Sequence, residues 1–110
     1  MSKRPVQVLL EDTREAAARI QEYTKGMSED TFLKDRRTSD AVVRNLEIIG
    51  EAASRLPTEF IQQHADIAWE QIVGLRHRIV HDYFGIDLKL VWQILQHDLP
   101  AFQAQLAALP

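Results

Sequence analysis

One short segment of the chain gathers the residue types that could carry out catalysis. The sequence GLRHRIVHDYF, residues 74–84, contains two arginines, two histidines, an aspartate and a tyrosine around an apolar pair. Histidine exchanges protons near neutral pH, and arginine offers a planar, permanently charged group that fits phosphate oxygens. Arg76, His77 and His81 are therefore candidates for acid–base chemistry at a phosphate.

Cleavage of an RNA phosphodiester is a reaction that these three side chains could carry out without a metal ion. RNA supplies its own nucleophile, the 2′-hydroxyl. The protein must accept that proton, protonate the leaving 5′-oxygen and stabilise the charge that develops on the phosphate. A histidine can serve in either proton transfer, and a fixed arginine can stabilise the developing charge.

Two other interpretations of this segment remain open. His77 and His81 have the i, i+4 spacing of zinc ligands, although no third ligand lies nearby in the sequence and two arginines would repel a cation. Alternatively, the cationic residues simply end a helix, where positive charge meets the negative end of the helix dipole.

The spacing of these residues on a helix limits which of them can act together. His77 and His81 are four residues apart and share one face of a continuous helix. Arg76 and His81 are five residues apart, which separates them by about 140° around the helix axis. A site that contains both needs either a curled Arg76 side chain or a second copy of the helix.

The length and composition predict a single domain spanning residues 1–110. The net charge of −3 argues against a protein that coats nucleic acid, but the locally basic sequence KDRR, residues 34–37, still allows a small phosphate site. The absence of Cys excludes disulfides and thiolate metal sites and fits a cytoplasmic location. No apolar run approaches the roughly 20 residues that cross a bilayer, and the charged N-terminal sequence predicts no export signal. We therefore expect a cytoplasmic protein without a membrane partner.

Apolar residues recur at helical spacing along most of the chain, and no long stretch alternates like a strand. The pattern predicts an all-α bundle of four main helices with one or two short helices. The expected first residues and caps are Pro5, Thr38 or Ser39, Asp66 and Asp87 for the main helices, and Ser28 and Thr58 for the short ones. The expected ends are Gly26, Pro57 and Gly85. The third main helix is expected to run unbroken through Trp69, Arg76 and Tyr83.

Three features fall outside this regular pattern. Pro100 lies inside the last helix and should distort it, because its ring clashes with the carbonyl oxygen four residues earlier. Gly50 lies in the middle of a helix, where a second helix of the same chain or of another subunit could approach closely. Trp92 and Ile94 flank the apolar stripe of the last helix and could belong to the rim of the core or to an interface.

Several blocks of the sequence together resemble the HepT-like proteins of the HEPN superfamily. Arg76-x4-His81, with a polar residue after the arginine and Tyr83 two residues after the histidine, resembles their R-x4-H-x-Y motif. The blocks DAVVRNLEIIGEAASRLP, IVGLRHRIVHDYFGID and VWQILQHDLP look like that family's blocks in their usual order and cover most of the chain from residue 40 onward. His77 stands where the family often has asparagine.

The resemblance implies a HEPN bundle that forms a symmetric dimer, with the two motif helices meeting at a shared cleft. It also implies a metal-independent endoribonuclease toxin that needs no cofactor. Arg76 and His81 take the catalytic positions: Arg76 would stabilise the scissile phosphate, and His81 would act as general acid or base. His77 takes the supporting polar position.

The implied partner is an MntA-like minimal nucleotidyltransferase that serves as antitoxin. Tyr83 matches the tyrosine that such a partner adenylylates (AMPylation) to silence the toxin, although a tyrosine packed at the rim of the core would explain it as well. The alternative function is a non-catalytic module that docks a nucleotidyltransferase, which would have no need of both Arg76 and His81. A further matching block lies on the second main helix, where an exposed ionic face would explain its polar residues equally well: Arg44, Asn45, Glu47 and Glu51.

Overall fold

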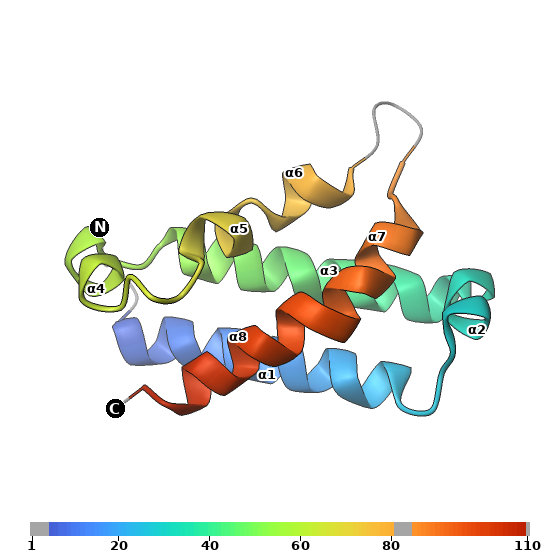
Figure 1. The fold of residues 1–110 in the computed structure, drawn as a ribbon, viewed down its shortest axis with the longest axis horizontal. Helices are drawn as coiled ribbons and strands as arrows, with labels where there is room; N and C mark the ends of the chain where they lie inside the picture. The colour runs from blue at the N-terminus through green and yellow to red at the C-terminus, as the bar shows by residue number, and fades with distance from the viewer. Residues whose placement is uncertain (1–4, 81–84, 110) are drawn as a thin grey trace.

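Three long helical stretches form the body of the computed structural model, which describes residues 5–80 and 85–109. Helices α1 (Val6–Thr24) and α3 (Arg36–Ser54) lie side by side and run in opposite directions (Figure 1). The third stretch crosses them and consists of α7 (Leu88–Gln93), the π-helical turn η1 (Ile94–Asp98) and α8 (Leu99–Ala107).

Four short helices complete the described part of the chain. Helix α2 (Glu29–Lys34) joins α1 to α3, and α4 (Thr58–Gln63) follows α3. Helices α5 (Trp69–Val73) and α6 (Leu75–Ile79) lie along the side of α3 that faces away from α1 (Figure 1). The prediction of an all-α bundle is confirmed, and within residues 5–80 and 85–109 the only strand-like pairing is one antiparallel bridge between Val80 and Ile86. None of the described helices is both long and apolar enough to span a membrane.

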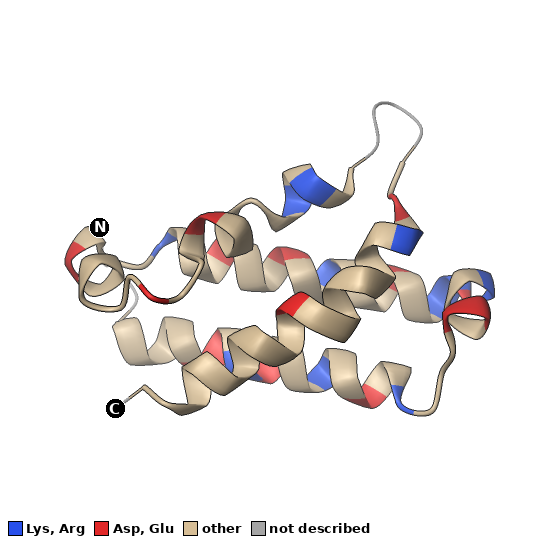
Figure 2. Ribbon diagram, in the orientation of Figure 1, with Lys and Arg blue, Asp and Glu red and all other residues tan. Residues whose placement is uncertain are grey.

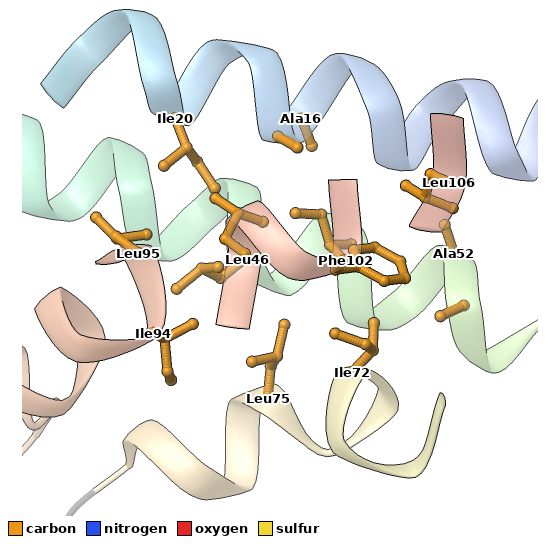
Figure 3. Close-up of a cluster of buried hydrophobic side chains, with 14 of the residues drawn as sticks. Ala16, Ile20, Leu46, Ala52, Ile72, Leu75, Ile94, Leu95, Phe102 and Leu106 are labelled. Carbon is orange, nitrogen blue, oxygen red and sulfur yellow. The ribbon is translucent and has the colours of Figure 1, made fainter. Parts of the chain in front are cut away.

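The core lies where α1, α3, α5, α6 and the last helical stretch converge (Figure 3). Most side chains of the apolar stripes that the sequence predicts for these helices are buried there, and those labelled in Figure 3 include Ile20, Leu46, Ile72, Leu75, Phe102 and Leu106. Three residues at predicted stripe positions are exposed instead: Tyr23 (39%), Val73 (42%) and Val80 (41%). Trp92 and Ile94 also belong to this core rather than to an interface, with exposed fractions of 9% and 2%. The ring of Trp92 packs on Phe32 of α2 with 5.3 Å between centroids, so α2 is anchored to the last helical stretch.

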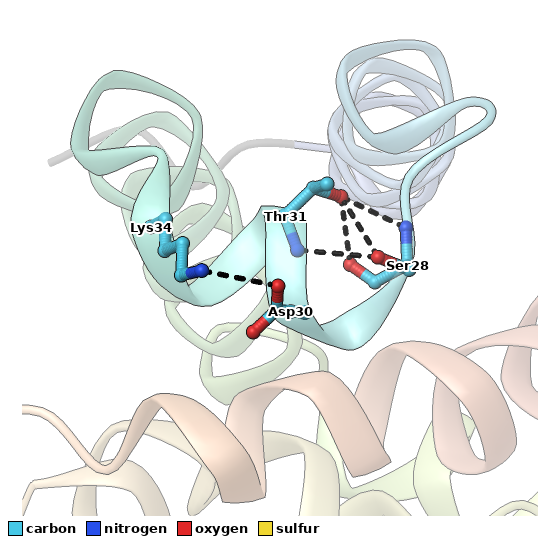
Figure 4. Close-up of polar contacts among 4 residues, drawn as sticks. All are labelled: Ser28, Asp30, Thr31 and Lys34. Carbon is cyan, nitrogen blue, oxygen red and sulfur yellow. Dashed lines mark hydrogen bonds and ion pairs between the residues drawn. The ribbon is translucent and has the colours of Figure 1, made fainter.

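Two of the predicted helix caps are confirmed. The Ser28 hydroxyl accepts the Thr31 backbone N–H at 3.2 Å, and the Thr31 hydroxyl accepts the Ser28 N–H at 2.9 Å, which forms a capping box at the start of α2 (Figure 4). The Asp87 carboxylate accepts the Leu90 N–H at 3.1 Å at the start of α7. Gly26 follows α1 with a φ of 78°, a left-handed conformation suited to glycine.

The predicted start of α3 at Thr38 or Ser39 is wrong, because the helix begins at Arg36 and is capped by Asp35. One carboxylate oxygen of Asp35 accepts the Thr38 N–H at 3.0 Å, and the other accepts the Thr38 hydroxyl at 2.8 Å. The Ser39 hydroxyl donates to the Arg36 carbonyl oxygen at 3.1 Å. Both hydroxyls therefore serve the first turn of the helix, and the carboxylate before them supplies the cap.

The caps predicted at Thr58 and Asp66 are also wrong. Thr58 is the first residue of α4 rather than its cap, and Pro57 occupies the capping position without a side-chain hydrogen bond. Helix α5 begins at Trp69, after Ala68, so Asp66 lies too far upstream to cap it. The Trp69 indole N–H donates to the His64 carbonyl oxygen at 2.9 Å. This side-chain contact, rather than a cap by Asp66, holds the turn before α5.

The unbroken helix predicted through residues 66–83 is wrong as well. The backbone breaks at Gly74, where a Cβ atom would lie only 3.1 Å from the Glu70 carbonyl oxygen, and α6 ends at Ile79. Val80 is extended, with a ψ of 127°. The carbonyl oxygen of Ile79 accepts the Asp87 N–H at 2.7 Å. A hydrogen bond from the start of α7 thus takes the place of the bond that would have continued the helix.

The distortion predicted at Pro100 takes the form of the π-helical turn η1, which directly precedes α8. Proline lacks a backbone N–H, and its ring needs space beside the preceding turn. A wider π turn at that point lets the helix continue with Pro100 near the start of α8.

Gly50 is a point of close approach within the chain. A Cβ atom on Gly50 would lie 3.2 Å from the Ile72 carbonyl oxygen and 3.5 Å from that of Val73. Glycine therefore lets the backbone of α5 pack directly on α3, which favours the intramolecular explanation of this residue.

Candidate active site

The short helix α6 presents its two arginines to opposite flanks of the molecule. Leu75 and Ile79, one turn apart, are buried and fix the inner face of the helix. Arg76 and Arg78 are two residues apart and so point to opposite sides of it. Lys and Arg positions on α6 and at the start of α7 flank the gap in the described chain (Figure 2).

Arg76 is the exposed arginine, with a side chain that is 75% accessible to solvent. Its Nε atom lies 3.8 Å from a carboxylate oxygen of Glu47 on α3. Such a long and exposed ion pair contributes little to stability. The guanidinium of Arg76 is therefore free to exchange this carboxylate for another anion.

Arg76 and His77 line a surface hollow of about 580 Å³ between α1, α3, α5 and α6. The α3 side of this hollow carries Arg44, Glu47, Glu51 and Arg55. The ion pair between Glu51 and Arg55, at 3.5 Å, is the i, i+4 contact that their spacing predicts. Polar side chains of both signs thus surround the two motif residues that the structure describes.

Arg78, in contrast, is partly buried and forms a short ion pair within the fold. Its Nη2 atom donates to a carboxylate oxygen of Asp98 at 2.9 Å, and the two side chains are 32% and 30% exposed. Its Nη1 atom is buried and has no hydrogen-bond partner among the described residues. Asp98 belongs to η1, so this pair ties the motif helix to the π-helical turn before Pro100.

His81 and Tyr83, which the sequence predicts as catalytic and modified residues, lie outside the described residues. The described chain resumes at Gly85, and the bridge between Val80 and Ile86 brings the two flanks of this segment together. The expectation that His77 and His81 share a face of one helix does not hold, because α6 ends at Ile79 and Val80 is extended. His77 itself is exposed and lies next to Arg76 at the hollow.

The structure adds Asp98 as a residue that supports the motif helix and separates Asn45 from the site. Asn45 is buried: its amide oxygen accepts from Arg19 at 3.0 Å and its amide nitrogen donates to the Ala41 carbonyl at 2.8 Å, which is a packing role. Asp98 and Arg78 are 20 positions apart, so the local spacing of residues could not predict their contact. No cluster of three or more His, Asp or Glu side chains suited to a metal ion occurs within residues 5–80 and 85–109.

The fold and the site together define an all-α bundle that carries an arginine–histidine centre on a short, partly exposed helix. The chain belongs to the HepT-like family: the family described as Ribonuclease HepT-like matches residues 13–109. This membership supports a ribonuclease function and RNA as the substrate. No solved structure matches the chain.

Three curated relatives illustrate the similarity. "Probable ribonuclease HepT" of Thermococcus cleftensis is 36% identical over 107 residues, which cover 97% of this chain and 97% of that protein. "Putative RNase MJ1380" of Methanocaldococcus jannaschii is 38% identical over 96% of both chains. "Putative RNase MJ0127" of the same organism is 39% identical over 91% of this chain and 83% of its own length. All three names refer to ribonucleases.

Proposed function

We propose that the protein is a metal-independent endoribonuclease in which Arg76 and His81 are the catalytic residues. The observation that carries this proposal is the exposed, weakly paired side chain of Arg76 in a chain of the HepT-like ribonuclease family. Its guanidinium is largely exposed at a surface hollow, and its only ion pair with a described residue is the long contact with Glu47. A phosphate group can replace that carboxylate and accept two parallel hydrogen bonds from the arginine.

The proposed reaction is an internal transfer within the RNA. The 2′-oxygen loses its proton to a histidine and forms a bond to the adjacent phosphorus. The bond from phosphorus to the 5′-oxygen of the next nucleotide breaks, and that oxygen takes a proton from a general acid. The products are a 2′,3′-cyclic phosphate and a 5′-hydroxyl. Arg76 stabilises the charge on the phosphate oxygens during the transfer.

His81 supplies one of the two proton transfers, and His77 is the nearest second candidate in the sequence. His77 is exposed beside Arg76 at the hollow. His77 and His81 are therefore the two candidates for the general acid and the general base.

We also propose that the active form is a homodimer built around the α5–α6 face. Val73, Val80 and Ile86 are large apolar residues with exposed fractions of 42%, 41% and 38%, and they flank the motif helix on both ends. Exposed apolar side chains gathered beside a functional site are typical of an interface. A second copy at this face would bring a second Arg76 and His81 to the same cleft.

The proposed biological setting is a cytoplasmic toxin–antitoxin pair. The antitoxin would be an MntA-like nucleotidyltransferase that silences the toxin by AMPylation of Tyr83. In that reaction the phenolic oxygen of Tyr83 bonds to the α-phosphorus of ATP, pyrophosphate leaves, and the phenol proton passes to water. The AMP group would add bulk and a phosphate two residues after His81, where it would compete with RNA.

The experiment that tests this function is RNA cleavage by the purified protein in excess EDTA. His81→Ala is the test variant, and His97→Ala is the matched control because His97 is exposed on η1, outside the motif. Intact mass establishes that Tyr83 carries no AMP. We expect cleavage by the wild type and the control, 2′,3′-cyclic phosphate ends, and a loss of at least about a hundredfold in His81→Ala, the usual size of an acid–base contribution.

Two results would contradict this function in different ways. Cleavage that requires a divalent metal, or that survives in His81→Ala, would refute the proposed mechanism. An unmodified wild-type dimer that cleaves neither bulk cellular RNA nor tRNA would favour a module that only docks a nucleotidyltransferase.

A further inference from the structure

A second surface hollow lies beside the first and shares two of its lining residues. The second hollow has a volume of about 540 Å³ and is lined by the first half of α3, the end of α2 and the start of α7. Arg44 and Glu47 line both hollows, which places them on the ridge between the two. The hollows therefore form neighbouring parts of one surface along α3.

The described residues on either side of positions 81–84 line different hollows. Arg76 and His77 line the first hollow, whereas Ile86 lines the second. Each volume falls in the range of about 300–1,000 Å³ that is common for small-molecule sites. A polymer that has one phosphate at Arg76 can thus extend over Arg44 into the second hollow.

The charges of the second hollow favour an anion at Arg36 and Arg44. Lys34 is already paired with Asp30 at 3.2 Å, and Glu47 faces Arg76. Arg36 and Arg44 are exposed and have no ion pair with a described residue. Asp40, one helical turn from each of them, is the remaining carboxylate in the lining and partly offsets their charge.

Apart from Ser39, whose hydroxyl donates to the Arg36 carbonyl oxygen, the uncharged lining of the second hollow is apolar, which suits a nucleotide better than a free phosphate ion. Leu33, Val43 and Leu88 are half-buried in its wall. Proteins that hold single-stranded nucleic acid combine cations for the backbone with apolar or planar groups for the bases. Two arginines above an apolar wall provide that combination.

We propose that the second hollow binds a nucleotide that flanks the cleavage site, with Arg36 and Arg44 holding its phosphate. This inference rests on the proposed ribonuclease function and names the path of its substrate. The basic sequence KDRR, residues 34–37, gains a role in it: Arg36 lines the hollow, and its neighbour Arg37 does not. RNA therefore runs along α3 from the first hollow to the second.

The test measures binding rather than cleavage, so that it does not depend on catalysis. The probes are a 2′-O-methyl dinucleotide, whose single phosphate occupies the cleavage position, and a longer 2′-O-methyl oligonucleotide; neither has the 2′-hydroxyl nucleophile. Binding of each to the full-length dimer is followed by fluorescence anisotropy at several salt concentrations. The variants are Arg36→Ala, Asp40→Asn and, as the control of equal charge change, Arg37→Ala.

The expected effects have opposite signs, which a general loss of folding cannot reproduce. Arg36→Ala should raise the Kd of the long probe about tenfold, the effect of one charge-assisted hydrogen bond, and lower its salt slope by about 1. Asp40→Asn should lower the same Kd, because it removes a negative charge beside the phosphate. Arg37→Ala should change it by less than about twofold, and the dinucleotide should bind all four proteins alike.

Each other outcome overturns the proposal. An unchanged Kd of the long probe in Arg36→Ala, an equal change in Arg37→Ala, or an equal change for the dinucleotide would remove the second hollow from the RNA path. A dimer that dissociates on Arg36→Ala would assign this surface to the subunit interface instead. Cleavage assays of His81→Ala decide the proposed function separately, so a failure there is distinguishable from a failure here.

Discussion

Arg76 and Arg78 lie on the same short helix but have different environments, and these environments give them different roles. Arg76 is 75% exposed and its ion pair with Glu47 is 3.8 Å long, so an anionic substrate can displace the carboxylate. Arg78 is less than half as exposed, at 32%, and its pair with Asp98 is 2.9 Å long. Breaking the second pair would leave a partly buried charge without a partner, which is costly. Arg76 is therefore suited to bind substrate and Arg78 to hold the helix.

Also at the scale of single residues, the lowered pKa of Asp35 leads us to predict that the stability of the protein depends on pH. Hydrogen bonds from the Thr38 backbone N–H and then from its hydroxyl hold the pKa of Asp35 below the usual value of 3.8. The folded state thus binds this proton less readily than the unfolded state. The contribution of Asp35 to stability is present above the unfolded-state pKa and is lost as the pH falls through the folded-state pKa.

The variant Asp35→Asn tests this dependence, since asparagine can still cap the helix but does not titrate in this range. Denaturant unfolding of both proteins at a series of pH values gives the difference in free energy of unfolding. We expect the wild type to be the more stable protein near neutral pH and the difference to shrink below about pH 4. A difference that stays constant throughout the acid range would contradict the lowered pKa.

At the scale of the helices, the position of α6 depends on neighbours rather than on its own length. A helix of five residues, Leu75–Ile79, is not stable in isolation. Its inner face is held by buried Leu75 and Ile79, and its flank is held by the contact between Arg78 and Asp98. Because Asp98 lies in the π-helical turn before Pro100, the distortion of the last helix and the placement of the motif helix are connected.

We predict that Asp98→Asn lowers the free energy of unfolding by roughly 1–2 kcal/mol, near the lower end of the range for hydrogen bonds to charged groups, because both side chains are partly exposed. Asp30→Asn is the matched control: its pair with Lys34 is 3.2 Å long, but both side chains are 76% exposed, so little change is expected. Urea denaturation measures both. A double-mutant cycle with Arg78→Gln should show coupling, and independent effects of the two substitutions would refute the contact as a stabilising pair.

At the scale of the whole molecule, the face that carries α5 and α6 is the one we expect a second copy to cover. Val73→Glu should convert the proposed dimer to a monomer, because it places a charge in the proposed apolar interface. It should also reduce RNA cleavage by at least about tenfold through loss of the proposed shared cleft. The control Tyr23→Glu changes a residue of α1, on the opposite side of α3 (Figure 1), that is similarly exposed at 39%.

Sedimentation velocity and cleavage assays on the same preparations test this prediction. A Val73→Glu protein that remains a dimer would move the interface away from this face. A monomer with full activity would show that one chain holds a complete site.

The sequence alone determined the helices whose apolar stripes are long and regular. Most apolar residues of α1, α3 and the last helical stretch are buried at the predicted spacing, because the hydrophobic effect acts on any amphipathic helix in the same way. The local caps Ser28 and Asp87 were equally predictable, because each side chain accepts the backbone N–H three residues later. The motif around Arg76 and the family were also evident from residue types and their order.

Tertiary contacts decided the features of the site that the sequence left open or assigned differently. The motif helix ends at Ile79 because the Asp87 N–H occupies its carbonyl oxygen, and it breaks at Gly74, where a side chain would crowd the Glu70 carbonyl. Asp98 reaches Arg78 across 20 positions through the π-helical turn. Each of these interactions joins residues that are remote in the sequence or depends on backbone geometry, so no periodicity or local spacing could encode it.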